Sequence, residues 1–217
     1  REVNELPKDP YLIYEKNINS SNLIDDQGLN AQDMSSRILD ISSSHDMVGI
    51  LSSGKIVKGF ANSLGQFNWH ESDSFNFDWS LYDDNGKAVK QNYADRKWNQ
   101  DTFTRLYAES AQQLSVISND EQKVEPGSYK VYLSPSALNE IIDMMSWGGF
   151  SYKANKIGSS PLHLMAKGDR EFDKSVSFSE DLSNGISPKF HSDGFIKPNN
   201  TELITEGKYQ KSLISPR

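Results

Sequence analysis

The sequence predicts an α+β fold, with an antiparallel sheet meander and packing helices followed by the start of a second, β-rich domain. Three observations support this. One stretch alternates apolar and polar residues, an Asn-Gly turn follows it, and two later stretches have helical spacing. A polar segment, 119–126, separates the two parts. We therefore expect residues 1–123 to belong to an N-terminal α/β domain and residues 124–217 to a C-terminal β-rich domain.

The best-defined predicted strand covers residues 75–81. Phe75, Phe77, Trp79 and Leu81 point to one side, and polar residues stand between them. This period of two is typical of a half-buried antiparallel strand. Asp84-Asn85-Gly86 then predicts a tight hairpin turn, because Asn and Gly tolerate positive φ angles. The return strand is expected over about 87–93.

The residues before this hairpin predict shorter elements. Apolar spacing favours a helix over 31–43, with Asn30 or Asp33 as the N-cap. The remaining predictions are a short strand at Tyr11–Tyr14, an apolar run at Val48–Leu51 ended by Ser52-Ser53-Gly54, further apolar residues at Ile56-Val57 and Phe60, and a turn at Asn62–Gly65.

After the hairpin, residues 101–117 read as an amphipathic helix capped by Asp101. Its apolar stripe is Phe103, Leu106, Tyr107, Leu114 and Ile117. A strand at 130–133 is followed by Ser134-Pro135, a cap with proline at the first helical position. The next helix has its apolar face at Leu138, Ile141, Ile142 and Met145 and ends at Gly148-Gly149, and short strands are expected near 176–178, 190–195 and 203–204.

Composition restricts the classes of function. The chain has 217 residues, a formal net charge of -7 and no cysteine. An acidic surface repels phosphate backbones, so we expect no nucleic-acid partner, and small basic clusters such as Lys87/Lys90 read as solvated charges. No apolar run reaches the about 18 residues of a membrane span, so we expect no membrane partner. The lack of cysteine fits a cytoplasmic location. The first residue, Arg1, is not an initiator, and we expect a piece of a longer protein without a visible leader.

Motifs for catalysis are missing from the sequence. The four histidines, His45, His70, His163 and His191, are not paired at metal-ligand spacing. His70-Glu71 could begin a zinc motif, but Ser74 stands where the second histidine is needed, so we expect an exposed histidine on a strand. No Gly-x-Ser-x-Gly elbow, dinucleotide fingerprint or P-loop occurs. We therefore predict no catalytic residue, no cofactor and no metal ligand, although composition leaves a Ser/His/Asp set open.

Several stretches resemble the TldD/PmbA family, formerly called modulators of DNA gyrase. They are Asn62-Ser63-Leu64-Gly65, the strand and helix start over 126–137, Ile157-Gly158-Ser159-Ser160, Phe190-His191-Ser192-Asp193-Gly194, and Leu203–Tyr209. The likeness is strong over about 124–217 and looser before it. It implies the middle of a longer protein with the family's two-domain fold.

The resemblance also implies a role in proteolysis or peptide maturation. The family's catalytic subunit carries His-Glu-x-x-x-His on the helix after the strand. Aligned through Gly158-Ser159-Ser160, that motif falls on Asp143, Met144 and Gly148. The resemblance therefore points to the zinc-less PmbA/TldE-like branch, and Met144 and Met145 are expected to pack.

Such a subunit pairs with a zinc-bearing TldD-like subunit and binds unfolded or short peptides along strand edges. A homo-oligomer is also open. The alternatives are a stand-alone binding or structural protein of the same fold and a modulator of DNA gyrase.

Overall fold

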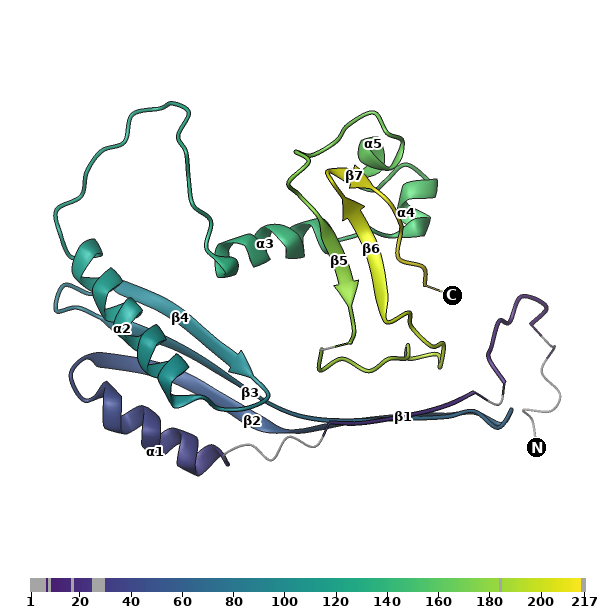
Figure 1. Ribbon diagram of the computed structural model, residues 1–217, viewed down its shortest axis with the longest axis horizontal. Coiled ribbons are helices and arrows are strands. Elements are labelled where there is room, and N and C mark those ends of the chain that lie inside the picture. Colours follow the sequence, from purple (N-terminus) through teal and green to yellow (C-terminus); the bar gives the residue numbers. More distant parts are fainter. Residues whose placement is uncertain (1–6, 8, 17, 25–29, 184, 216–217) are drawn as a thin grey trace. The chain divides into compact units, whose positions relative to one another are not determined.

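The computed structural model describes residues 7, 9–16, 18–24, 30–183 and 185–215. The fold is α+β, as predicted at that level. The chain forms two compact units (Figure 1). Unit 1 comprises Arg1–Ile18, Phe60–Gln66 and Ser128–Arg217, and unit 2 comprises Asn19–Gly59 and Phe67–Gly127. The assignment of 1–123 and 124–217 to two domains of a longer protein stays a prediction.

Unit 2 contains a sheet centred on β3 (Phe67–Tyr82). β1 (Asn19–Ile24) pairs in parallel with the first half of β3, and β4 (Ala88–Asp95) pairs antiparallel with the second half. β2 (Asp46–Ala61) is the other neighbour of β3 and ends the strand order. The sheet is therefore mixed, and the predicted meander accounts only for β2, β3 and β4.

The two halves of β3 bury opposite faces. Phe75, Phe77, Trp79 and Leu81 are buried, as predicted. In the first half the buried side chains are instead Asn68, His70 and Ser72, which have the opposite parity. Because successive side chains point to opposite faces, the covered side of the strand changes near Asp73 and Ser74.

Two helices of unit 2 belong to the core around this strand. α1 (Ala31–Ser42) contributes Met34 and Ile38, and α2 (Gln100–Ile117) contributes Phe103, Tyr107 and Leu114. Asn30 caps α1, as predicted, by accepting from the backbone N–H of Asp33 at 2.9 Å. The cap of α2 is Asn99 rather than Asp101, because the Asn99 side chain accepts from the Thr102 N–H at 2.8 Å. Ile117 at the end of the predicted stripe is exposed.

Three strand predictions are wrong. Tyr11–Tyr14 and 130–133 form no strand, and their apolar side chains are exposed. A strand needs a hydrogen-bonded neighbour, and neither stretch has one among the described residues. Conversely, Ser52-Ser53-Gly54 does not end a strand, because β2 continues through it as the neighbour of β3.

Unit 1 is built from short elements around a second core. They are α3 (Pro135–Ser146), α4 (Tyr152–Lys156), α5 (His163–Ala166), β5 (Phe178–Asp181), β6 (Asn200–Thr205) and β7 (Lys208–Tyr209). Phe150, Leu162, Met165, Leu203 and Ile204 form that core. The predicted strand at 176–178 begins only at Phe178, and 190–195 forms only a bridge from Phe190 to Ile196. Within the described part of the chain, no helix is both long enough and apolar enough to cross a membrane.

Candidate functional site

A turn at Asn62–Gly65 organises one part of unit 1. The Asn62 side-chain oxygen accepts from the backbone N–H groups of Leu64 at 3.0 Å and Gln66 at 3.1 Å. Its amide donates to the Gln66 side-chain oxygen at 3.0 Å. Gly65 has a φ of 81°, a conformation that glycine adopts without strain. The turn predicted from the sequence is confirmed, and it fixes the side chain of Gln66.

Gln66 joins this turn to a second one far along the chain. Its side-chain amide donates to the carbonyl oxygen of Gly194, and both groups are buried. Gly194 has a φ of 86°, and a Cβ placed there would collide with the ring of Phe60. The turn at His191–Gly194 is closed by a bond from the Gly194 N–H to the His191 carbonyl at 3.0 Å. Two sequence-distant turns therefore pack directly on each other.

A cleft of about 450 Å³ lies beside the second turn, within unit 1. Among the residues that line it are two acidic residues, Glu15 and Glu180, two basic residues, Lys197 and Lys211, and His191. The Glu15 carboxylate accepts from the Ile196 N–H at 3.4 Å. The volume falls in the about 300–1,000 Å³ range of small-ligand sites. A lining with both signs of charge, donors and acceptors suits a zwitterionic or peptide-like ligand better than a strongly charged one.

Sequence reasoning missed most of this cleft. The sequence motifs include His191 and the turn around it, but none of them contains Glu15, Lys197 or Lys211. No local signal joins them, because Glu15 and Ile196 are separated by 181 positions. Only a chain fold that returns the N-terminal segment to the second turn makes them neighbours.

The histidines have separate hydrogen-bond partners. His45 Nδ1 is 2.7 Å from the Tyr107 hydroxyl, and His163 Nδ1 is 3.1 Å from the Asn155 carbonyl oxygen. His70 is on a strand, as predicted, but it is fully buried rather than exposed. Its Nδ1 is 3.3 Å from the side-chain nitrogen of Asn22 on β1, because the parallel pairing places these two residues side by side. Over the residues that the structure describes, no three His, Cys, Asp or Glu side chains are grouped as metal ligands would be.

The positions of the family's zinc motif lie on α3 and just after it. The Asp143 carboxylate accepts from the Asn139 amide at 3.1 Å, and the side chain is exposed. Met144 is 63% exposed, so the expectation that it packs is wrong, whereas Met145 packs against the unit 1 core. Gly148 ends the helix with a φ of 81°. Ser134 caps α3 as predicted, with Pro135 at its start.

An apolar surface continues from the segment before α3 onto the helix. We define the 129–147 surface by its exposed members Tyr129, Val131, Tyr132, Leu133, Leu138, Ile141, Met144 and Trp147. Val131 is 70% exposed and Tyr132 86%. Although α3 has the apolar face predicted from its spacing, none of its residues is buried. A stretch of chain with this many exposed apolar side chains is typical of an interaction surface.

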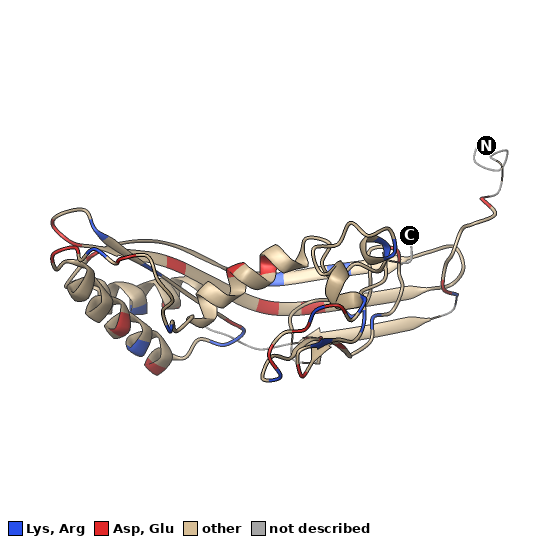
Figure 2. Ribbon diagram, turned by 90° about the horizontal axis from the view of Figure 1, so that it is seen from above, with Lys and Arg blue, Asp and Glu red and all other residues tan. Residues whose placement is uncertain are grey.

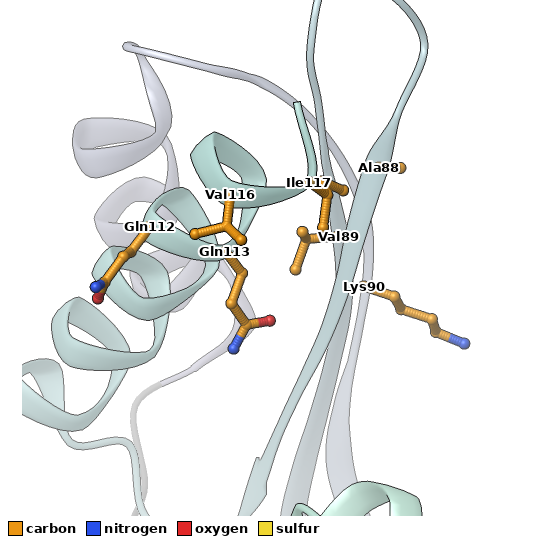
Figure 3. Close-up of a pocket in the computed structure, with 7 residues that line it drawn as sticks. All are labelled: Ala88, Val89, Lys90, Gln112, Gln113, Val116 and Ile117. Carbon is orange, nitrogen blue, oxygen red and sulfur yellow. The ribbon is translucent and has the colours of Figure 1, made fainter. Parts of the chain in front are cut away.

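A second hollow, of about 460 Å³, lies between α2 and β4 in unit 2 (Figure 3). Val89 points toward the helix, where Val116 and Ile117 stand, while Lys90 points away. Gln112 and Gln113 supply the polar groups. This lining can accept an apolar side chain, but it offers no acid, base or nucleophile directed into the hollow.

Several carboxyl groups have lowered pKa values for structural reasons. Hydrogen bonds from Asn92 and then Asn76 lower the pKa of Asp78. The Ser118 hydroxyl, with backbone N–H groups, lowers the pKa of Asp83 in the β3–β4 turn. The Ser183 hydroxyl lowers the pKa of Asp181 at the end of β5. These carboxylates stabilise turns and strand pairs when they are ionised. Because their pKa values are lowered, they are poorly suited to proton transfer near neutral pH.

Comparison with known proteins adds no relative: no protein-family model, curated protein sequence or solved structure matches the chain.

Proposed function

We propose that the chain belongs to a PmbA/TldE-like subunit, the zinc-less partner in a TldD–TldE-type cytoplasmic metallopeptidase that degrades or matures peptides. One observation carries the proposal. Two of the stretches that resemble the TldD/PmbA family, Asn62–Gly65 and Phe190–Gly194, pack on each other through Gln66 and Phe60. Two stretches that resembled the family only by chance would not be expected to contact each other in the folded chain.

The glycines of the resembling stretches give further support. Gly65, Gly158, Gly194 and Gly207 all have φ angles between 76° and 86°. Such angles are strained for residues with a Cβ. Four of the five glycines in these stretches therefore sit where the backbone favours glycine, whereas the fifth, Gly127, has no positive φ.

The chemistry of α3 agrees with a zinc-less role. Where the catalytic subunit carries its ligands and general base, this chain has Asp143, Met144 and Gly148. A thioether does not activate water, and glycine has no side chain to bind zinc. The partner proposed to supply the zinc is a TldD-like subunit.

The 129–147 surface is the proposed contact region for that partner. The segment 130–133, predicted as a strand, pairs with none of the described strands. Pairing with a strand of the partner would satisfy its backbone and cover its side chains. The cleft beside His191, with both signs of charge, is the proposed contact for unfolded or short peptide.

The charge distribution favours this role over action on DNA. Acidic and basic residues are interspersed along the ribbon (Figure 2), and the formal net charge is -7. A protein that grips a phosphate backbone needs a basic patch or stripe.

The test is co-expression of the full-length protein with a TldD-type protein from the same genome. We expect a complex that cleaves short peptides and contains zinc. Val131→Asp should abolish the complex, because it places a charge on the proposed contact, while Lys167→Asp, at another exposed position of unit 1, should leave it intact. Failure of any TldD-type protein to co-purify would favour a stand-alone binding protein, and co-purification with gyrase instead would favour the modulator.

A further inference from the structure

β2 is a long strand that lies at the edge of its sheet among the described strands. It spans 16 residues and ends the strand order of its sheet, with β3 as its only neighbour among the described strands. None of its residues is buried. A row of unpaired backbone N–H and C=O groups of this length is a template for pairing with another strand, and proteins usually protect such edges.

The open face of β2 is apolar in its first half. Met47 and Leu51 pack against the unit 2 core, and Gly49 lies so close to Phe77 that a Cβ would be within 2.7 Å of the ring. By alternation the even-numbered residues face the other way. Among them Val48 is 62% exposed and Ile50 73% exposed. The strand therefore offers apolar side chains beside this edge of the sheet.

Charges at the two ends of the strand suit pairing with a copy of itself. Asp46 lies at one end and Lys58 near the other, both exposed, and the structure gives neither an ion-pair partner among the residues it describes. We propose that two copies of this chain pair antiparallel along β2, with Ser52 facing Ser52 at the two-fold axis. In this register Asp46 of each copy faces Lys58 of the other copy, and Val48 of each copy faces Ile56 of the other.

Neighbouring registers fit less well. Antiparallel pairing about a two-fold axis requires facing residues whose numbers have an even sum. A shift to the next such register places Asp46 opposite Phe60 and Val48 opposite Lys58, so both charge pairs are lost. Opposite charges stabilise directly facing pairs and like charges destabilise them, so the charges select the register. The inference does not depend on the proposed peptidase role.

The first test reverses the charges. Sedimentation of the full chain should show a concentration-dependent dimer. Asp46→Lys should weaken it about tenfold, because the two-fold axis makes each substitution act twice. Asp46→Lys with Lys58→Asp should restore it, and Lys123→Asp should have no effect. A wild-type chain that stays monomeric at high concentration, or a double variant no better than Asp46→Lys, would overturn the proposal.

The second test uses the absence of cysteine from the chain. In Ser52→Cys the two thiols would face each other across the axis, within reach of a disulfide. Mild oxidation should therefore give a covalent dimer. Asn85→Cys, in the exposed β3–β4 turn, should remain monomeric under the same treatment. Equal cross-linking of the two variants would contradict the register.

Discussion

Gly194 illustrates how a residue without a side chain can join two distant stretches of unit 1. Its φ is 86°, its carbonyl oxygen accepts from Gln66, and its Cα faces the ring of Phe60. A Cβ would be strained by the backbone angle and would collide with the ring. The two turns can therefore pack this closely only because residue 194 has no Cβ.

We expect Gly194→Ala to destabilise unit 1 by about 2 kcal/mol or more, since a positive φ and overpacking each cost about 1 kcal/mol or more. Gly168→Ala is the matched control. Gly168 has a φ of 82°, but a Cβ there would meet nothing within 4 Å, so only the conformational cost applies. Chemical denaturation followed by circular dichroism measures both. Equal losses of stability in the two variants would mean that the contact with Phe60 adds nothing to the cost of Gly194→Ala.

Asp78 gives a pH dependence with a definite sign. Hydrogen bonds from Asn92 and Asn76 lower its pKa in the folded protein, so the ionised form stabilises the fold. This stability is complete well above the unfolded pKa of about 3.9 and is lost as the pH falls through the lower folded pKa. Asp78→Asn should therefore cost stability at pH 7 and little at pH 2 to 3. Urea titrations at both pH values test this, and an equal cost at both would rule out the ionic contribution.

At the scale of the element, β3 combines two environments in one strand. Its second half presents aromatic and aliphatic side chains to α1 and α2, and Phe77 stacks on Trp79 with ring centroids 4.9 Å apart. Its first half buries Asn68, His70 and Ser72 instead. Ser20 on β1 donates to the Asn68 side-chain oxygen at 2.8 Å, and Asn22 contacts His70. Buried polar side chains of this kind need such partners, so the parallel pairing of β1 is tied to the polar half of β3.

The register of the second half can be tested by truncation. Leu81 is fully buried, so Leu81→Ala should destabilise unit 2 by about 2–5 kcal/mol through lost burial and a residual cavity. Ser80→Ala, on the opposite face, should change stability by less than about 0.5 kcal/mol. Thermal melts of the two variants compare them directly. A larger loss from Ser80→Ala would reverse the assignment of the faces.

For the whole molecule, the proposed subunit role predicts no activity of the isolated chain. Purified alone, it should hold far less than one zinc per molecule and hydrolyse no peptide. In a complex with a TldD-type partner, Asp143→Ala and Met144→Ala should leave turnover within a few-fold, because neither position carries a reactive group. Both side chains are exposed, so the fold should tolerate the changes, and a melt with each assay checks this. Casein digestion by the isolated, metal-free chain at a chelator-insensitive rate would refute the role.

Much of the local structure could be predicted from neighbouring residues. The alternation of Phe75 to Leu81, the Asn85-Gly86 turn, α1, α2 and the Ser134-Pro135 start of α3 all have signals within a few positions. Periodicity and helix caps depend on residues only a few positions apart, so they can be recognised directly in the sequence. The apolar face of α3 was also visible, although burial did not follow, because burial requires a second surface.

Long-range pairing determined the rest. A strand exists only beside another strand, so the apolar residues of 130–133 were not sufficient to form one. β2, by contrast, continues through Ser52-Ser53-Gly54 because β3 lies beside it. The same dependence explains the parallel contact of β1, the burial of His70 and the cleft that joins Glu15 to His191. The partners in these contacts are about 50 to 180 positions apart. No local pattern encodes them, since they arise only when the folded chain brings hydrogen-bonding groups and side chains into contact.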